Sequence, residues 1–361
     1  MKPLIVDAHQ DLAYNMLTFG RDYTQPVEET RSREAGGLAV EHNGDCTLSW
    51  QEYQRGRVAL IFSTLFAAPI RGKERTGWET QVYADMEQAH RLYNLQIDTY
   101  NRLFDKHPDK FTPIHTRGQL EATLAKWEQA DQPAPTGLIT LMEGAEGVRS
   151  VGELEEWWQR GVRLIGPAWK STRFCGGTRE PGPLTAEGRE LLQGMAPIGF
   201  TLDISHMAWE SAVEALDLYE GAIVASHANA LKQVRNGSIN RFLTDEIIEG
   251  IIKRDGVIGV VPFNSFLIEG WTKSDPRSDV PLDMVAAQMD YICQKAGDAS
   301  HVGLGTDFDG GFGLQSIPDG LDTVADIQQL GPLLEARGYS QADIAGIMGG
   351  NWIRTLRRTL P

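Results

Sequence analysis

His9 and Asp11 are the first residues of the chain whose types and spacing could do chemistry. They lie in the run VDAHQD, directly after the apolar residues 4–6. In an extended segment, side chains two positions apart point to the same face. An imidazole and a carboxylate that converge in this way suit zinc or a similar divalent ion. The spacing therefore predicts a pair of metal ligands at the end of the first strand.

The same types of residue recur at the ends of later apolar runs. The further candidates are Glu143 in LMEGAEG, His206 in DISH, His227 in VASH and Asp307 in GLGTDFDG. A single histidine of this kind is more often a core residue than a ligand. Here, however, three of the 8 histidines directly follow apolar runs. A shared metal site explains this recurrence better than five independent coincidences do.

The number of ligands indicates how many ions the site would hold. A single open catalytic zinc usually takes three protein ligands, whereas five are available, namely His9, Asp11, Glu143, His206 and His227. Two ions that share one carboxylate would use all five. Such ions lie about 3.5–4 Å apart and can share a hydroxide as nucleophile. Asp307 then remains as a general base, which would pass a proton from the water to the leaving group.

Apolar, β-rich runs supply the strands on which these residues would sit. Their ranges are 4–6, 58–66, 138–142, 162–168, 199–205, 222–226, 256–263 and 302–306. Near-continuous apolar runs are typical of parallel strands buried on both faces. Helical patterns alternate with them near 79–104, 118–130, 151–160, 185–197, 208–218, 244–254, 283–296, 322–337 and 341–357, with Thr244 and Ser340 as N-caps. This alternation predicts a (β/α)8 barrel, with an open doubly wound sheet as the alternative.

The domain organisation follows from the length and the spacing of these runs. We expect residues 1–361 to form a single barrel domain, with a polar loop insertion near 12–57 that contains some helix. No repeat or linker divides the chain. Because chemistry in such barrels lies at the carboxyl ends of the strands, the candidate ligands are expected to meet at one rim.

Composition restricts the classes of partner. The chain has 34 Lys+Arg against 49 Asp+Glu and a net charge of −15, which argues against nucleic acid or an anionic membrane. The 3 cysteines, Cys46, Cys175 and Cys293, form no CxxC motif and fit a reducing compartment. No apolar run reaches about 18 residues, and the first strand leaves no room for a signal peptide. We therefore expect a cytoplasmic protein.

With these motifs and the closing GGNWIRTL, the chain resembles the membrane (renal) dipeptidase family, peptidase family M19 of the amidohydrolase superfamily. The resemblance implies a (β/α)8 barrel with two zinc ions, a dipeptide or small amide substrate, tolerance of a C-terminal D-residue, and the capacity to form homodimers. By position, one ion would be held by His9, Asp11 and Glu143. The other would be held by Glu143, His206 and His227, and Asp307 would be the catalytic carboxylate.

The resemblance also assigns Arg241, in INRFLTDE, to the C-terminal carboxylate of the substrate. Such a contact would be charge-assisted and would measure the length of the substrate. The alternative for Arg241 is an exposed residue at the start of a helix.

Trp169 is a departure from the family pattern. It stands in GVRLIGPAWKSTRFCGG, where relatives such as the renal enzyme have a histidine that contacts the substrate carbonyl. Tryptophan donates only through its indole N–H. Trp169 would therefore replace that donor or shape the pocket, with Lys170 or Arg173 assisting. Alternatively, hydrolysis has been retuned or lost.

Two other functions remain open because of Trp169. One is another amidohydrolase, such as a deacylase or deaminase, although many of those enzymes have HxH on strand 1 and a modified lysine as the bridge. The other is a metal-binding barrel without catalysis. A purely structural site needs no general base, so the presence of Asp307 argues against this second alternative.

Overall fold

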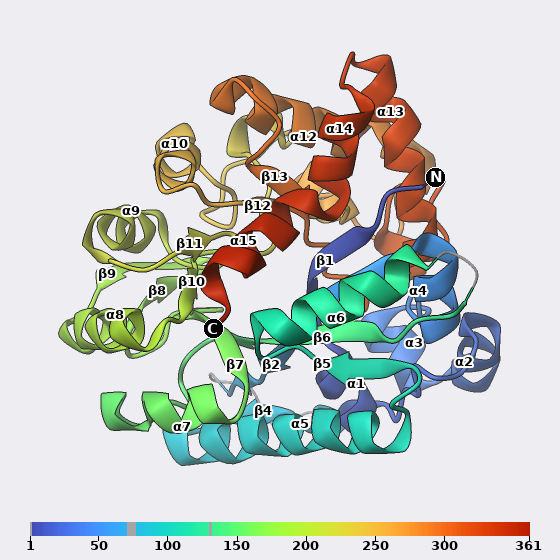
Figure 1. Cartoon of the computed structure of the whole chain (residues 1–361). Coiled ribbons are helices and arrows are strands. Elements are labelled where there is room, and N and C mark those ends of the chain that lie inside the picture. The colour runs from blue at the N-terminus through green and yellow to red at the C-terminus, as the bar shows by residue number, and fades with distance from the viewer. Residues whose placement is uncertain (1, 71–76, 130–131) are drawn as a thin grey trace.

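The computed structural model describes residues 2–70, 77–129 and 132–361. Its centre is a parallel sheet with the strand order β11-β10-β7-β6-β2-β1-β13-β12 (Figure 1). The strands are β1 (Ile5–Gln10), β2 (Val58–Phe66), β6 (Thr136–Glu143), β7 (Val162–Gly166), β10 (Thr201–Asp203), β11 (Ile223–Val224), β12 (Ile258–Val260) and β13 (Val302–Leu304).

The two ends of this sheet meet. A parallel bridge joins Ala225, just after β11, to Ile258 of β12, so the eight strands form a nearly closed barrel. Each strand lies within or overlaps one of the apolar runs read from the sequence, and every residue of β1 is buried. The predicted (β/α)8 barrel is confirmed, and the open sheet is excluded. A short ninth strand, β5 (Phe111–Pro113), pairs with β6 and was not predicted.

Helices surround the barrel (Figure 1). They include α5 (Met86–Lys106), α6 (Arg117–Glu128), α7 (Leu154–Gln159), α8 (Ala186–Ile198), α9 (Trp209–Leu218), α10 (Asp245–Lys253), α12 (Asp283–Ala296), α13 (Leu330–Ala336), α14 (Gln341–Ala345) and α15 (Asn351–Thr359). Thr244 and Ser340 cap α10 and α14 as predicted, because their side chains accept from the backbone N–H three residues on. No helix in the described ranges is long and apolar enough to cross a membrane.

Two of the predicted helices differ from the observed ones, and a third was predicted to end outside the described residues. The helix expected over 79–104 begins only at Met86, because Asp85 caps it there and Val82–Tyr83 form strand β4, which pairs with β3 (Ala68–Pro69). The helix expected over 341–357 is interrupted by a π-helical turn at Gly346–Gly350. A Cβ at Gly349 would lie 2.7 Å from the carbonyl oxygen of Leu4, so this turn packs directly against the first strand. The last residue of the helix expected over 118–130 lies outside the described residues.

The insertion near 12–57 contains more helix than the sequence predicts. Its helices are α1 (Leu12–Thr18), α2 (Val27–Glu34), α3 (Leu38–Asn43) and α4 (Trp50–Gly56). A second excursion follows β7, where β8 (Cys175–Gly177) and β9 (Glu180–Leu184) form an antiparallel hairpin. Both excursions contribute residues to the pocket above the barrel.

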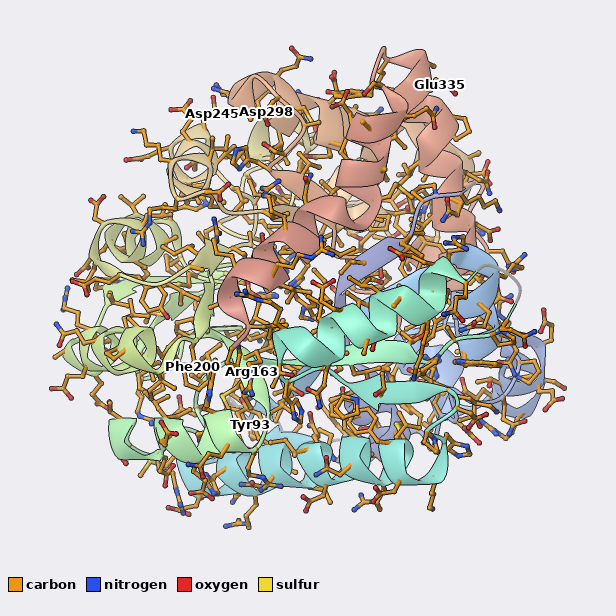
Figure 2. All side chains as sticks on the ribbon, in the orientation of Figure 1. Tyr93, Arg163, Phe200, Asp245, Asp298 and Glu335 are labelled. Atoms are coloured by element: carbon orange, nitrogen blue, oxygen red, sulfur yellow. The ribbon has the colours of Figure 1, made fainter. Side chains whose placement is uncertain are left out.

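Side chains on the outer helices also fix the loops that follow the strands. Tyr93, which Figure 2 labels, belongs to α5 and is buried. Its hydroxyl donates to the carbonyl of Gly144 over 2.6 Å. Gly144 has a φ of +77°, a left-handed conformation that favours glycine. The contact therefore fixes the chain directly after Glu143. By contrast, Asp298 and Glu335 lie at the exposed periphery (Figure 2).

Candidate active site

The six residues singled out from the sequence converge at one end of the barrel. His9 and Glu143 belong to the last residues of β1 and β6, and Asp11 follows β1 directly. His206, His227 and Asp307 lie in the segments that follow β10, β11 and β13. Five of the six are buried, and the side chain of Asp307 is 13% exposed.

His9 faces three carboxylates. Its Nε2 lies 3.5 Å from Glu143 Oε2, 3.8 Å from Asp307 Oδ1 and 3.9 Å from Asp11 Oδ2. The hydroxyl of Thr64 donates to the other oxygen of Asp11 and fixes that carboxylate. The structure therefore gathers the imidazole of β1 and three acidic groups around one point.

The other two histidines approach Glu143 from its second oxygen. His206 Nε2 lies 2.9 Å and His227 Nε2 lies 3.6 Å from Glu143 Oε1. The two Nε2 atoms are 2.8 Å apart. Glu143 thus presents Oε2 toward His9 and Oε1 toward the pair His206 and His227, which is the geometry that a bridging carboxylate needs.

The groups present fit a divalent metal. Both ring nitrogens of His9 are buried and have no hydrogen-bond partner among the described residues. Buried polar atoms are rarely left in this state without a reason. Ligand atoms of His9, Glu143 and His227 lie within 4.8 Å of one another, as do those of His9, Asp11 and Asp307. Imidazole nitrogens with carboxylate oxygens are a donor set suited to zinc and related ions.

Hydrogen bonds behind the histidines orient two of them. Thr178 Oγ1 lies 2.8 Å from His206 Nδ1, and Ser226 Oγ lies 2.8 Å from His227 Nδ1. The hydroxyl of Ser226 also lies 2.5 Å from Asp203 Oδ2. With Nδ1 engaged in each ring, Nε2 is directed at the centre, as in known metal sites. Sequence reasoning missed these supporting residues, although Asp203 and Ser226 are conspicuous as polar residues at the ends of apolar runs.

The pKa shifts in the site reflect burial and the excess of carboxylates. Burial raises the pKa of Asp11 to about 6 and that of Asp307 well above its usual range. Burial alone would lower the pKa of His9, but Glu143, Asp11 and Asp307 outweigh it and raise the pKa to about 10. Burial and the cation of Arg241 lower the pKa of His206 to about 4. Such a cluster of acids is electrostatically suited to hold cations.

A cavity of about 420 Å³ opens above these residues, and Arg241 lines it. Arg241 is 1% exposed, which excludes the alternative of a surface residue. Its two terminal nitrogens donate to the carbonyls of Ser205 and His227 over 3.0 and 2.8 Å, and its Nε has no partner among the described residues. Burial lowers its pKa to about 10, so the guanidinium remains protonated at neutral pH.

Trp169 also lines the cavity. Its ring packs edge-on against Phe66 at 5.0 Å and lies 6.4 Å from the ring of His206, between centroids. Lys170 lines the same cavity, whereas Arg173 is outside the lining and pairs with Glu146 and Glu187. Of the two cations expected to assist Trp169, the structure therefore places only Lys170 at the pocket.

The family model described as membrane dipeptidase, peptidase family M19, matches residues 2–360. The chain belongs to this family. Two curated fungal relatives are the dipeptidase tcpJ of Claviceps purpurea, 25% identical, and the dipeptidase aclJ of Aspergillus oryzae, 23% identical. The first alignment covers 84% of this chain and 67% of the relative, and the second covers 98% and 77%.

Solved structures share the fold. A metallopeptidase from Rhodobacter sphaeroides, solved with a phosphinate mimic of the dipeptide L-Ala-D-Ala, superposes with a TM-score of 0.77 at 22% identity, covering 99% of this chain and all of its own. The probable dipeptidase PvdM from Pseudomonas aeruginosa gives 0.76 at 19% identity, covering 99% and 96%. The family expected from the sequence motifs is confirmed, and with it the class of enzyme, a hydrolase of dipeptides.

Proposed function

We propose that this chain hydrolyses dipeptides with two divalent ions, most naturally zinc, bridged by Glu143. The observation that carries the proposal is the position of Glu143, whose two oxygens face His9 on one side and His206 and His227 on the other. His9, Asp11 and Glu143 would hold one ion, and Glu143, His206 and His227 the other. Bound there, such ions supply a nucleophile from water at neutral pH and polarise a carbonyl.

Asp307 would handle the proton in this reaction. Its carboxylate lies at the edge of the centre, 3.8 Å from His9 Nε2, and is still partly open to the pocket. Water adds to the peptide carbonyl, and Asp307 accepts the proton that the water loses. The C–N bond then breaks, and Asp307 returns the proton to the leaving amine.

The walls of the pocket would select the substrate. Arg241 is protonated and lines the pocket, which supports a role in binding the C-terminal carboxylate. Trp169 narrows the pocket beside His206 and would shape it for a small substrate. We propose that substrates with L- and D-configured C-terminal residues are accepted, in line with the L-Ala-D-Ala mimic bound to the Rhodobacter relative.

We also place the enzyme in a reducing compartment such as the cytoplasm. Cys46, Cys175 and Cys293 are all buried as free thiols. Free buried cysteines are usual where thiols are kept reduced.

The decisive experiment is hydrolysis of a panel of L-Xaa-L-Xaa and L-Xaa-D-Xaa dipeptides by the zinc-reconstituted protein, with a chelated sample as control. We expect cleavage that is lost with chelator and restored with zinc, and two ions per chain by elemental analysis. A protein with two ions bound that cleaves no dipeptide would overturn the proposal. Cleavage of other amides would then favour a different amidohydrolase, and inactivity on all amides would favour a non-catalytic barrel.

A further inference from the structure

Three basic side chains from residues 170–241 line the pocket above the proposed metal site. Lys170 follows β7, Arg179 lies at the turn of the β8–β9 hairpin, and Arg241 lies just before α10. Hydrogen bonds hold the hairpin against the segment that carries Arg241. The Oδ1 of Asn240 accepts from the backbone N–H of Arg179 over 2.8 Å, and its Nδ2 donates to the carbonyl of Gly177 over 2.8 Å.

Lys170 and Arg179 have no carboxylate within ion-pair distance in the part of the chain that the structure describes. Lys170 instead lies with its Nζ 5.4 Å from the centroid of the Trp169 ring. Cations kept free of acidic partners at the mouth of a pocket are available to a negatively charged ligand.

The other side of the pocket has aromatic rings and an acidic side chain. Tyr14, Trp78 and Glu79 line it, and His42 stacks on Trp78 with centroids 4.0 Å apart. Glu79 lines the pocket together with Tyr14, and after burial its carboxylate is the largest cause of the raised pKa of Tyr14. Among the described lining residues, the acidic group outside the proposed metal centre is therefore Glu79, on the side near Asp11, whereas Lys170, Arg179 and Arg241 lie on the side near His206.

We infer that the preferred substrates are dipeptides with an acidic C-terminal residue, whose side-chain carboxylate is bound by Lys170 and Arg179. This inference rests on the proposed dipeptidase function and adds a substrate class to it. Arg241 would take the α-carboxylate, and the two outer cations would take the second carboxylate on the same side of the pocket. A ligand with two negative charges at one end matches three cations on one wall, whereas a neutral side chain leaves two of them unused.

The test compares isosteric pairs of substrates, Ala-Asp with Ala-Asn and Ala-Glu with Ala-Gln, in both configurations of the second residue. We expect kcat/KM to favour each acidic dipeptide by about tenfold, mainly through KM, because charge-assisted contacts act on binding. The variants Lys170→Met and Arg179→Gln should each lower this preference about threefold, and the double variant should abolish it. Lys253→Met, at an exposed lysine of α10, is the matched control and should leave the preference unchanged.

The outcomes separate the inference from the proposed function. Equal cleavage of acidic and neutral dipeptides would overturn the inference and leave the dipeptidase intact. If no dipeptide is cleaved, calorimetry of Ala-Asp and Ala-Asn binding to the zinc-loaded protein still tests the acidic site. Tighter binding of Ala-Asp that is lost in the Lys170→Met and Arg179→Gln double variant supports the acidic site. Equal binding, or a preference that the double variant retains, contradicts it.

Discussion

Asp307 and Asp309 lie two residues apart in the loop after β13, and their carboxylates have opposite surroundings. Both have left-handed backbone conformations, with φ values of 57° and 62°. The carboxylate of Asp309 has no exposed surface and pairs with Arg21 Nη1 at 3.0 Å. It also accepts from the backbone N–H and the hydroxyl of Thr47 over 2.9 and 2.8 Å. The carboxylate of Asp307 accepts no hydrogen bond from the described residues and faces His9 and the pocket.

This difference separates a structural carboxylate from the one that we propose takes part in the reaction. Asp309 holds the insertion of residues 12–57 onto the barrel, because its partners Arg21 and Thr47 both belong to that insertion. Every one of its contacts is made inside the protein, so none is left for a substrate. Asp307 lacks such partners, and its proton affinity is open to change during a reaction.

The largest expected effect is on turnover in Asp307→Asn. The amide cannot accept and return a proton, so kcat should fall about 10²- to 10⁴-fold, the range that general acid–base groups contribute. Asparagine tolerates a left-handed conformation, and the backbone should therefore be unaffected. Steady-state kinetics on a cleaved dipeptide measure the loss. Zinc content and thermal unfolding should match the wild type, and an unchanged kcat would remove Asp307 from the proposed role.

Asp309→Asn should instead act on stability. Removing one partner of a buried ion pair costs about 3–5 kcal/mol, and we expect the lower end because Glu34 still pairs with Arg21 at 3.0 Å. Urea unfolding would measure the change. The variant should keep its metal content and most of its kcat while folded, which is the reverse of the Asp307→Asn result.

A second substitution tests the physical cause of that loss. If the loss of stability comes from an uncompensated charge, the double variant Asp309→Asn/Arg21→Met should lose much less free energy of unfolding than the two single variants lose in sum. Additive costs would show instead that Asp309 acts mainly through Thr47 and the local backbone.

The sequence predicts the residues of the proposed active site better than it predicts the buried ion pair of Asp309. His9, Glu143 and His227 each follow an apolar run, and the carboxyl ends of parallel strands must meet at one rim, so their proximity follows from the barrel itself. The pairing of Arg21 with Asp309 joins residues 288 positions apart and depends on how the insertion packs. Asp307 directly follows the apolar run 302–306, whereas no local pattern in DFDGG indicates the partners of Asp309.

The dependence on tertiary contacts also explains the other differences between the predicted and the observed structure. The helices of residues 12–57 gain their stability from packing on the barrel, which periodicity does not report; α2, for example, has no clear apolar face. The tie between Asn240 and the β8–β9 hairpin, which brings Arg179 to the pocket, is likewise a tertiary contact. Residue spacing locates the ends of strands, whereas the partners of polar side chains are set by the assembled fold.

The smallest effect should appear at alkaline pH, through Cys46. Burial raises the pKa of this thiol well above its usual range, and Asp309, whose Oδ2 lies 3.3 Å from Sγ, raises it further. The unfolded thiol loses its proton near pH 8.5 while the folded one keeps it, so above that pH the unfolded chain binds fewer protons and stability falls. The slope is at most about 1.4 kcal/mol per pH unit.

Urea unfolding at pH 8.0 and pH 9.5, under reducing conditions, would test this assignment in wild type and in Cys46→Ala. The stability lost between the two pH values should be about 1 kcal/mol larger in wild type, because Tyr23 and Tyr53 have raised pKa values in both proteins and contribute equally. Asp309→Asn should show an intermediate loss, since it removes the neighbouring charge but leaves the thiol buried. Equal losses in all three proteins would mean that the interior around Asp309 opens to solvent before the thiol titrates, and that the contrast with Asp307 is smaller than the structure indicates.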